Sequence, residues 1–117
     1  MPKIDNLTRL RHIRDAAVEA LGFVGSLKRN DLNTNRMLVL ALVKDIEIIG
    51  EAATNLSPVC RSRHPQLPWA DIIGMRNRLV HAYFEIDLDI VWEVVSNDLP
   101  FLVSELDGII QNEEDLL

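Results

Sequence analysis

The sequence has few of the features on which secreted and membrane proteins depend. Cys60 is the only cysteine, so no disulfide can form within the chain, and a lone thiol is typical of a reducing compartment. The longest uninterrupted apolar stretch, residues 37–43, is too short to cross a bilayer, and no apolar run of an export signal follows Met1. We therefore expect a cytoplasmic protein that does not span a membrane.

Positive charge is also in short supply. The 12 Lys and Arg residues are outnumbered by 18 Asp and Glu residues, which gives a formal net charge of −6 at pH 7. Phosphate contacts usually need a basic surface, so this composition argues against a general nucleic-acid binder. Arginines do gather in the middle of the sequence, at Arg61, Arg63, Arg76 and Arg78. Any contact with RNA must then be local.

What the sequence does contain is the repeating pattern of amphipathic helices. Apolar residues recur every three or four positions and predict four helices, over about 4–27, 34–56, 68–83 and 87–110. Pro100 lies inside the fourth of these, where its missing N–H should bend the helix. No strand pattern competes, and 117 residues fit a single domain, 1–117, with one shared core. We expect an all-α bundle of four to five helices.

The second predicted helix is apolar on more than one side. Its apolar residues, among them Met37, Leu40, Ile46, Ile49 and Leu56, cover far more than one stripe of the helix. Such a helix either lies at the centre of a bundle or packs both on its own domain and on a second copy. Homodimerisation is therefore a hypothesis from the pattern alone.

The third predicted helix carries an arginine where an apolar residue is expected. On a helical wheel, Arg76 lies inside the apolar arc of residues 72–80. A buried guanidinium needs a partner, because an unpaired charge in the interior costs several kcal/mol. Two kinds of partner are open: a carboxylate of the second helix (Asp45, Glu47 or Glu51), or a phosphate that meets the guanidinium in a cleft.

Three further polar side chains follow Arg76 in this predicted helix. Asn77 and His81 are four positions apart and so share a face beside Arg76, whereas Tyr83, seven positions after Arg76, returns to nearly the same angle. Histidine is the usual proton carrier near neutral pH. Arg76, Asn77 and His81 can therefore bound one small polar pocket, with the Tyr83 phenol beside the guanidinium.

The same residues also have ordinary explanations. His81, like His12 and His64, fits a surface or helix-terminal histidine, and Tyr83 fits a half-buried packing aromatic. Cys60, His64 and His81 lack the spacing typical of zinc ligands, so no metal site is expected.

Segment 76–83 reads arginine, asparagine, three residues, histidine, one residue, tyrosine, and this pattern resembles the HEPN superfamily. A closer similarity, to the HepT toxin family, extends over the flanks of the segment and over parts of the second and third predicted helices (residues 46–53, 67–69, 74–84, 86–87 and 98–100). The resemblance covers essentially the whole chain.

The resemblance implies a HEPN-type bundle that dimerises so that two motifs face each other across a cleft. It also implies a metal-independent endoribonuclease without a cofactor, in which a ribose 2′-hydroxyl attacks the adjacent phosphate and leaves cyclic phosphate and 5′-hydroxyl ends. On this basis His81 moves the proton, Arg76 stabilises charge on the phosphoryl oxygens, and Asn77 orients the histidine or the substrate. Arg78 is expected either to contact the RNA backbone or to be an ordinary surface arginine.

The resemblance also implies a partner. HepT proteins resemble the toxin of a toxin–antitoxin pair whose other half, a small nucleotidyltransferase, binds the toxin and can transfer AMP to the tyrosine of the motif, here Tyr83. The added phosphate beside Arg76 would block and repel RNA. One rival interpretation is a noncatalytic adaptor subunit of a nucleotidyltransferase, which would be free to lose the arginine, asparagine and histidine. A purely structural dimerisation module is the other, and it gives no reason for Arg76.

Overall fold

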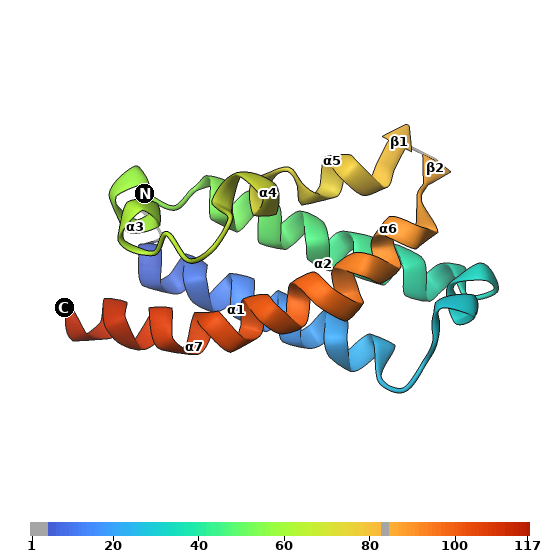
Figure 1. The fold of residues 1–117 in the computed structure, drawn as a ribbon, viewed down its shortest axis with the longest axis horizontal. Coiled ribbons are helices and arrows are strands. Elements are labelled where there is room, and N and C mark those ends of the chain that lie inside the picture. The colour runs from blue at the N-terminus through green and yellow to red at the C-terminus, as the bar shows by residue number, and fades with distance from the viewer. Residues whose placement is uncertain (1–4, 83–84) are drawn as a thin grey trace.

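The fold is a helical bundle with one small β-hairpin. The computed structural model describes residues 5–82 and 85–117. Helix α1 (Asn6–Val24) packs along both α2 (Arg36–Thr54) and α7 (Leu99–Asp115), and the molecule measures 46 × 28 × 26 Å (Figure 1). Helix α1 begins and α7 ends at one end of the bundle, and the hairpin lies toward the other. The prediction of an all-α bundle is confirmed.

The first two helices begin and end at residues with a clear stereochemical reason. The Asp5 carboxylate caps α1 by accepting the Thr8 N–H at 2.7 Å, and Gly25, with φ of 52°, ends it in a conformation that residues with a Cβ rarely adopt. A short 3₁₀ helix, η1 (Arg29–Asn33), follows, and the Asn35 side chain caps α2 by accepting the Leu38 N–H at 3.0 Å. Both predicted helices are confirmed to within a few residues.

Of the three long helices, α2 has the most buried residues. Its core residues include Leu42, Ile46 and Ile49, which are fully buried against neighbouring helices. At its first turns, however, Met37 is 83% exposed and Leu40 is 48% exposed. The surplus of apolar residues seen in the sequence is thus covered only in part within one chain.

The proline-containing connector after α2 folds in part into a short helix, α3 (Pro58–Arg63). The Ser57 side chain caps it, and Pro58 occupies the first helical position, where no N–H is needed. His64 ends α3, which agrees with a helix-terminal histidine, but it is buried, so a surface position for His64 is wrong.

The single helix predicted over 68–83 is wrong beyond its middle. Two short helices, α4 (Trp69–Ile73) and α5 (Met75–Leu79), are separated at Gly74, and α5 ends at Leu79. Helix α4 comes so close to α2 that a Cβ on Gly50 would lie 3.2 Å from the Ile73 carbonyl oxygen. The interruption allows two short segments, rather than one straight rod, to follow the surface of α2.

The prediction that the chain contains no strands is also wrong. Strand β1 (Val80–Ala82) pairs antiparallel with β2 (Glu85–Ile86), with Val80 opposite Ile86. The Asp87 N–H donates to the Leu79 carbonyl at 2.7 Å and closes the base of this hairpin. Two β-branched residues paired beside a fully buried Leu79 give the chain a local alternative to continuing the helix.

The fourth predicted helix is confirmed as a continuous helical path of three parts. Helix α6 (Leu88–Glu93) leads into a π-helical turn, η2 (Val94–Asp98), and then into α7. The π turn ends two residues before Pro100, which lacks the N–H that a regular helix would use. Among the described residues, no helix is long and apolar enough to cross a membrane.

Candidate active site

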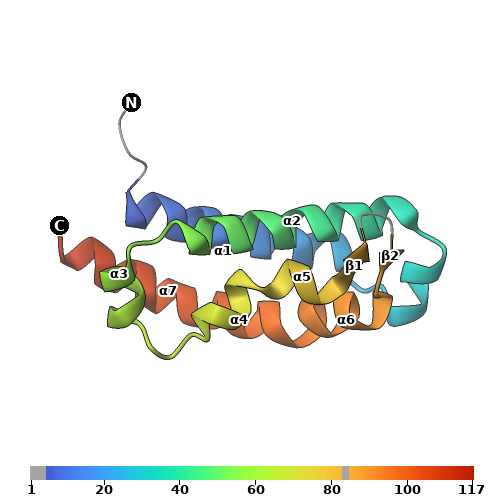
Figure 2. The same ribbon diagram turned by 90° about the horizontal axis from the view of Figure 1, so that it is seen from above.

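Arg76, Asn77 and Arg78 lie on α5 and His81 on β1, and α5 runs beside α2 and α6 (Figure 2). Met75 and Leu79, one helical turn apart, are buried and fix α5 to the core. The three residues between them on the outer turn, Arg76, Asn77 and Arg78, therefore project their polar groups outward.

Arg76 is not buried in the apolar arc that the sequence suggested. Its side chain is 44% exposed, and its Nε atom lies 3.8 Å from Oε2 of Glu47 on α2. Glu47 also accepts a hydrogen bond from the Lys44 ammonium at 3.3 Å. A long, exposed ion pair with a shared carboxylate contributes little stability, so the guanidinium is held near α2 but is free to take a better acceptor.

His81 lies on β1, with its side chain 52% exposed and its Nε2 atom 3.5 Å from Oδ2 of Asp87. The predicted shared helix face of Asn77 and His81 is wrong, because the helix ends at Leu79 before the histidine is reached. Asn77 is exposed on α5, so the two residues are presented by adjoining elements.

Asp87 lies beside His81, a contact that the sequence did not predict. One carboxylate oxygen, Oδ1, caps α6 by accepting the N–H groups of Asp89 and Ile90, both at 3.1 Å. The other oxygen faces His81. The Ile90 N–H, together with His81, holds the pKa of Asp87 below its usual range, so the carboxylate stays charged. In the sequence, Asp87 marks only the start of the fourth predicted helix.

Arg78 projects to another side of α5. Its guanidinium lies 3.3 Å from the Asp98 carboxylate, and both side chains are largely exposed. The pair borders a cavity of about 240 Å³ whose walls come from α4, α5, η2 and α7, with Met75 and Phe101 among its lining residues. Arg78 is thus paired within the chain, which agrees with an ordinary surface arginine and leaves its contact with RNA as a prediction.

Tyr83, predicted as the site of modification, lies outside the described residues. The hairpin strands on either side of it are described, and β1 carries His81 two positions earlier.

The fold and the position of the motif define the class of protein: an all-α bundle of the HEPN type. Residues 13–109 match the family described as Ribonuclease HepT-like, and the chain belongs to this family. No solved structure matches the chain at a significant level.

Similar proteins come from archaea and bacteria. A protein of Methanocaldococcus jannaschii named as a candidate RNase is 33% identical over 92% of this chain and 98% of its own length. Another candidate RNase, from Caldanaerobacter subterraneus subsp. tengcongensis, is 34% identical over 90% of this chain and 94% of its own. A Thermococcus cleftensis protein described as a probable ribonuclease HepT is 34% identical over 68% of this chain and 72% of its own.

Proposed function

We propose that this protein is a metal-independent endoribonuclease toxin that cleaves RNA with Arg76, Asn77 and His81. The observation that supports the proposal is the exposure of Arg76 and His81 and their weak pairing within the chain. Both are about half exposed on adjoining elements, and each is held by one carboxylate at long distance, 3.8 Å for Arg76 and 3.5 Å for His81. Neither side chain serves the core, and both are free to meet a substrate.

The proposed reaction is an attack of the ribose 2′-oxygen on the adjacent phosphorus. His81 accepts the 2′-hydroxyl proton as the O2′–P bond forms, and the P–O5′ bond then breaks. The proton carried by His81 passes to O5′, so a cyclic phosphate and a 5′-hydroxyl are the products and no water is consumed. The Asp87 carboxylate faces the imidazole and can accept a hydrogen bond from it while it carries the proton.

Arg76 provides positive charge where the phosphoryl oxygens become more negative. The planar guanidinium can leave Glu47 and donate two hydrogen bonds to a phosphate, which is a stronger interaction than the present long pair. Asn77, exposed beside it, orients the imidazole or the phosphate by hydrogen bonding. Arg78 contacts the RNA backbone further along the strand after exchanging its Asp98 partner.

We propose further that the active form is a homodimer with two motifs at one cleft. The apolar residues left uncovered on α2, Met37 and Leu40, support an additional packing partner for this helix. A second copy would supply apolar surface and a second set of Arg76 and His81 to the same RNA.

The proposed control is a toxin–antitoxin pair with a nucleotidyltransferase. The antitoxin transfers AMP to the Tyr83 hydroxyl, which forms an O–P bond and releases pyrophosphate from ATP. The added negative phosphate then competes for Arg76 and repels RNA. Family membership and the position of Tyr83 two residues after His81 support this proposal.

The decisive experiment is cleavage of a defined RNA by the purified full-length chain in excess EDTA. Wild type should cleave and leave cyclic phosphate ends, and Arg76→Ala and His81→Ala should each lose at least about a hundredfold in rate. Arg9→Ala and His12→Ala, which change residues of α1 outside the motif, are the matched controls and should cleave normally. Equal cleavage by all five proteins would refute the assignment.

A second candidate function is a noncatalytic adaptor for a nucleotidyltransferase. The net charge of −6 favours it, because an acidic surface opposes RNA binding in general. The adaptor predicts that wild type fails to cleave RNA yet still forms a stable complex with its nucleotidyltransferase in gel filtration.

A further inference from the structure

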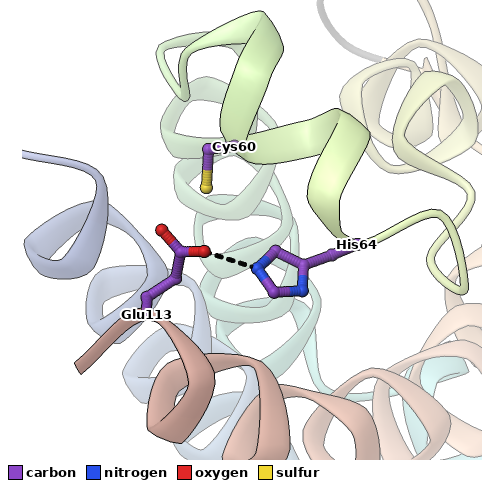
Figure 3. A group of neighbouring side chains, drawn as sticks. All are labelled: Cys60, His64 and Glu113. Atoms are coloured by element: carbon purple, nitrogen blue, oxygen red, sulfur yellow. Dashed lines mark hydrogen bonds and ion pairs between the residues drawn. The ribbon is translucent and has the colours of Figure 1, made fainter. Parts of the chain in front are cut away.

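Three buried side chains with metal-binding atoms meet at the end of the bundle away from the hairpin. Cys60 of α3, His64 at the end of α3 and Glu113 of α7 are 0%, 4% and 6% exposed. Their Sγ, imidazole nitrogen and carboxylate oxygen atoms all lie within 4.8 Å of one another (Figure 3). His64 Nε2 and Glu113 Oε2 are 2.7 Å apart.

Local structure brings these groups together and holds two of them in place. Cys60 and His64 are four positions apart and so project from the same side of a helical turn. The Cys60 N–H donates to the Ser57 capping oxygen at 3.1 Å, and the Trp69 indole N–H donates to the His64 carbonyl at 2.9 Å. Sequence spacing did not indicate the group, because Glu113 is 49 residues from His64.

An internal ion pair accounts for part of this cluster. Arg63 donates to both oxygens of Glu113, at 2.6 and 2.9 Å, and holds the pKa of Glu113 at about 2. His64 adds a third hydrogen bond to the same carboxylate. The bonds from Arg63 and His64 already satisfy the carboxylate, so this ion pair does not by itself require a thiol at position 60.

We propose that Cys60, His64 and Glu113 form a binding site for one zinc ion, separate from the nuclease site. Thiolate, imidazole and carboxylate are the protein ligands that Zn²⁺ takes, and three of them leave a fourth position for water. Ligand atoms around a tetrahedral zinc ion lie roughly 3.3–3.8 Å apart, so small side-chain movements convert the present cluster into a coordination shell.

Binding exchanges one proton and rearranges the hydrogen bonds of Glu113. The ion takes Oε2 from His64 and from Arg63 Nε, whereas the other Arg63 nitrogen keeps its bond to Oε1. Cys60 releases its thiol proton to solvent, so the ion, the thiolate and the carboxylate are neutral together and the site keeps the single positive charge of Arg63. The ion would fasten α3 to the last turns of α7, far from His81.

Co²⁺ can replace Zn²⁺ as a spectroscopic probe, because its absorption bands report the geometry and the ligands of the bound ion. The metal-free full-length chain is titrated with Co²⁺, and we expect one equivalent to give the visible bands of a tetrahedral ion and a sulfur-to-cobalt charge-transfer band. Zn²⁺ should abolish both by displacement. Because Cys60 is the only cysteine of the chain, the charge-transfer band identifies the ligand even without a variant.

The variants separate this site from adventitious binding. Cys60→Ala should lose the charge-transfer band and at least about tenfold in Co²⁺ affinity, whereas His12→Ala, which removes an exposed histidine of α1, should bind as wild type does. Pale octahedral cobalt without a charge-transfer band in the wild type, or equal affinity in Cys60→Ala, would overturn the zinc site. If Cys60→Ala does not fold, the wild-type spectrum decides.

Zinc should also raise the unfolding temperature of the wild type, since binding to the folded state alone stabilises it. Cobalt binding and the effect of zinc on the unfolding temperature do not depend on the nuclease activity, so His81→Ala should bind cobalt normally. The cleavage assay in EDTA tests the nuclease site separately, at the other end of the bundle.

Discussion

Asp87 joins the start of α6 to the proposed proton carrier through one carboxylate. Asp87→Asn keeps a good capping side chain but removes the charge that faces His81. We expect nearly unchanged stability and slower RNA cleavage, because the carboxylate that faces the imidazole during the proton transfer is lost. Asp87→Ala removes both functions and should also cost about 1 kcal/mol of stability.

Urea denaturation and the RNA-cleavage rate of each variant distinguish these effects. Equal cleavage rates for wild type and Asp87→Asn would show that Asp87 acts only as a helix cap.

Asp45 of α2 is a buried carboxyl group that forms no salt bridge with any basic side chain of residues 5–82 and 85–117. It is 2% exposed, and its Oδ2 atom has no hydrogen-bond partner in the part of the chain that the structure describes. Burial, followed by the nearby Glu19 carboxyl group of α1, raises the pKa of Asp45 to about 7 from its ordinary value of 3.8. Near neutral pH, the folded chain therefore holds a proton that the unfolded chain releases.

This difference gives stability a definite pH dependence. Between about pH 4 and 7, the free energy of unfolding should fall as pH rises, by at most about 1.4 kcal/mol per unit from this group. Asp45→Asn should abolish that decline and be more stable than wild type at pH 8. Urea midpoints measured at pH 5 and pH 8 test it, and a wild type with equal stability at both would contradict the pKa.

Residue patterns predicted which groups are charged but could not select the pairs among them. Asp45, Glu47 and Glu51 were equal candidates for Arg76, and Glu47 is the one in reach. Residues 45 and 47 point about 200° apart on a helix, so Asp45 faces α1 while Glu47 faces α5. Which side of α2 meets which neighbour is a tertiary fact that one helical pattern does not contain.

At the scale of the elements, the contact of α2 with α4 depends on Gly50. A Cβ at this position would lie 3.2 Å from the Ile73 carbonyl oxygen, whereas nothing lies within 4 Å of a Cβ built on Gly108 of α7. We expect Gly50→Ala to cost about 1–3 kcal/mol through this clash. Gly108→Ala should instead stabilise by up to about 1 kcal/mol, because alanine is the better helix former.

Urea denaturation of both variants makes this a matched comparison. If both glycine replacements stabilise equally, α4 can move away from α2 at no cost.

The long helices were predictable because each buries one side over many turns, which leaves a repeating pattern in the sequence. The hairpin was not, because strands of three and two residues are too short to show alternation. Its pairing depends on the hydrogen bond from Asp87 N–H to the Leu79 carbonyl, which only the folded backbone reveals. The sequence therefore placed Arg76 and Asn77 on a helix, as the structure does, but it extended that helix to His81, which lies on a strand.

For the whole molecule, the uncovered apolar residues of α2 predict self-association. Wild type should sediment as a dimer at micromolar concentration, and Leu40→Asp should shift it toward monomer and reduce RNA cleavage in proportion. Val59→Asp, on the exposed side of α3 at the other end, is the matched control and should remain dimeric. A wild type that sediments as a monomer would remove the dimer from the proposed function.

The bundle also separates its chain terminus from its motif. Helix α7 ends at one end of a body 46 Å long, and the hairpin that carries His81 lies toward the other (Figure 1). A fluorescent protein or a surface tether attached after Leu117 would consequently lie at the end of the bundle away from His81. Single molecules attached to a bead at that end would present the proposed nuclease site to the solution, so that cleavage of single RNA strands could be observed.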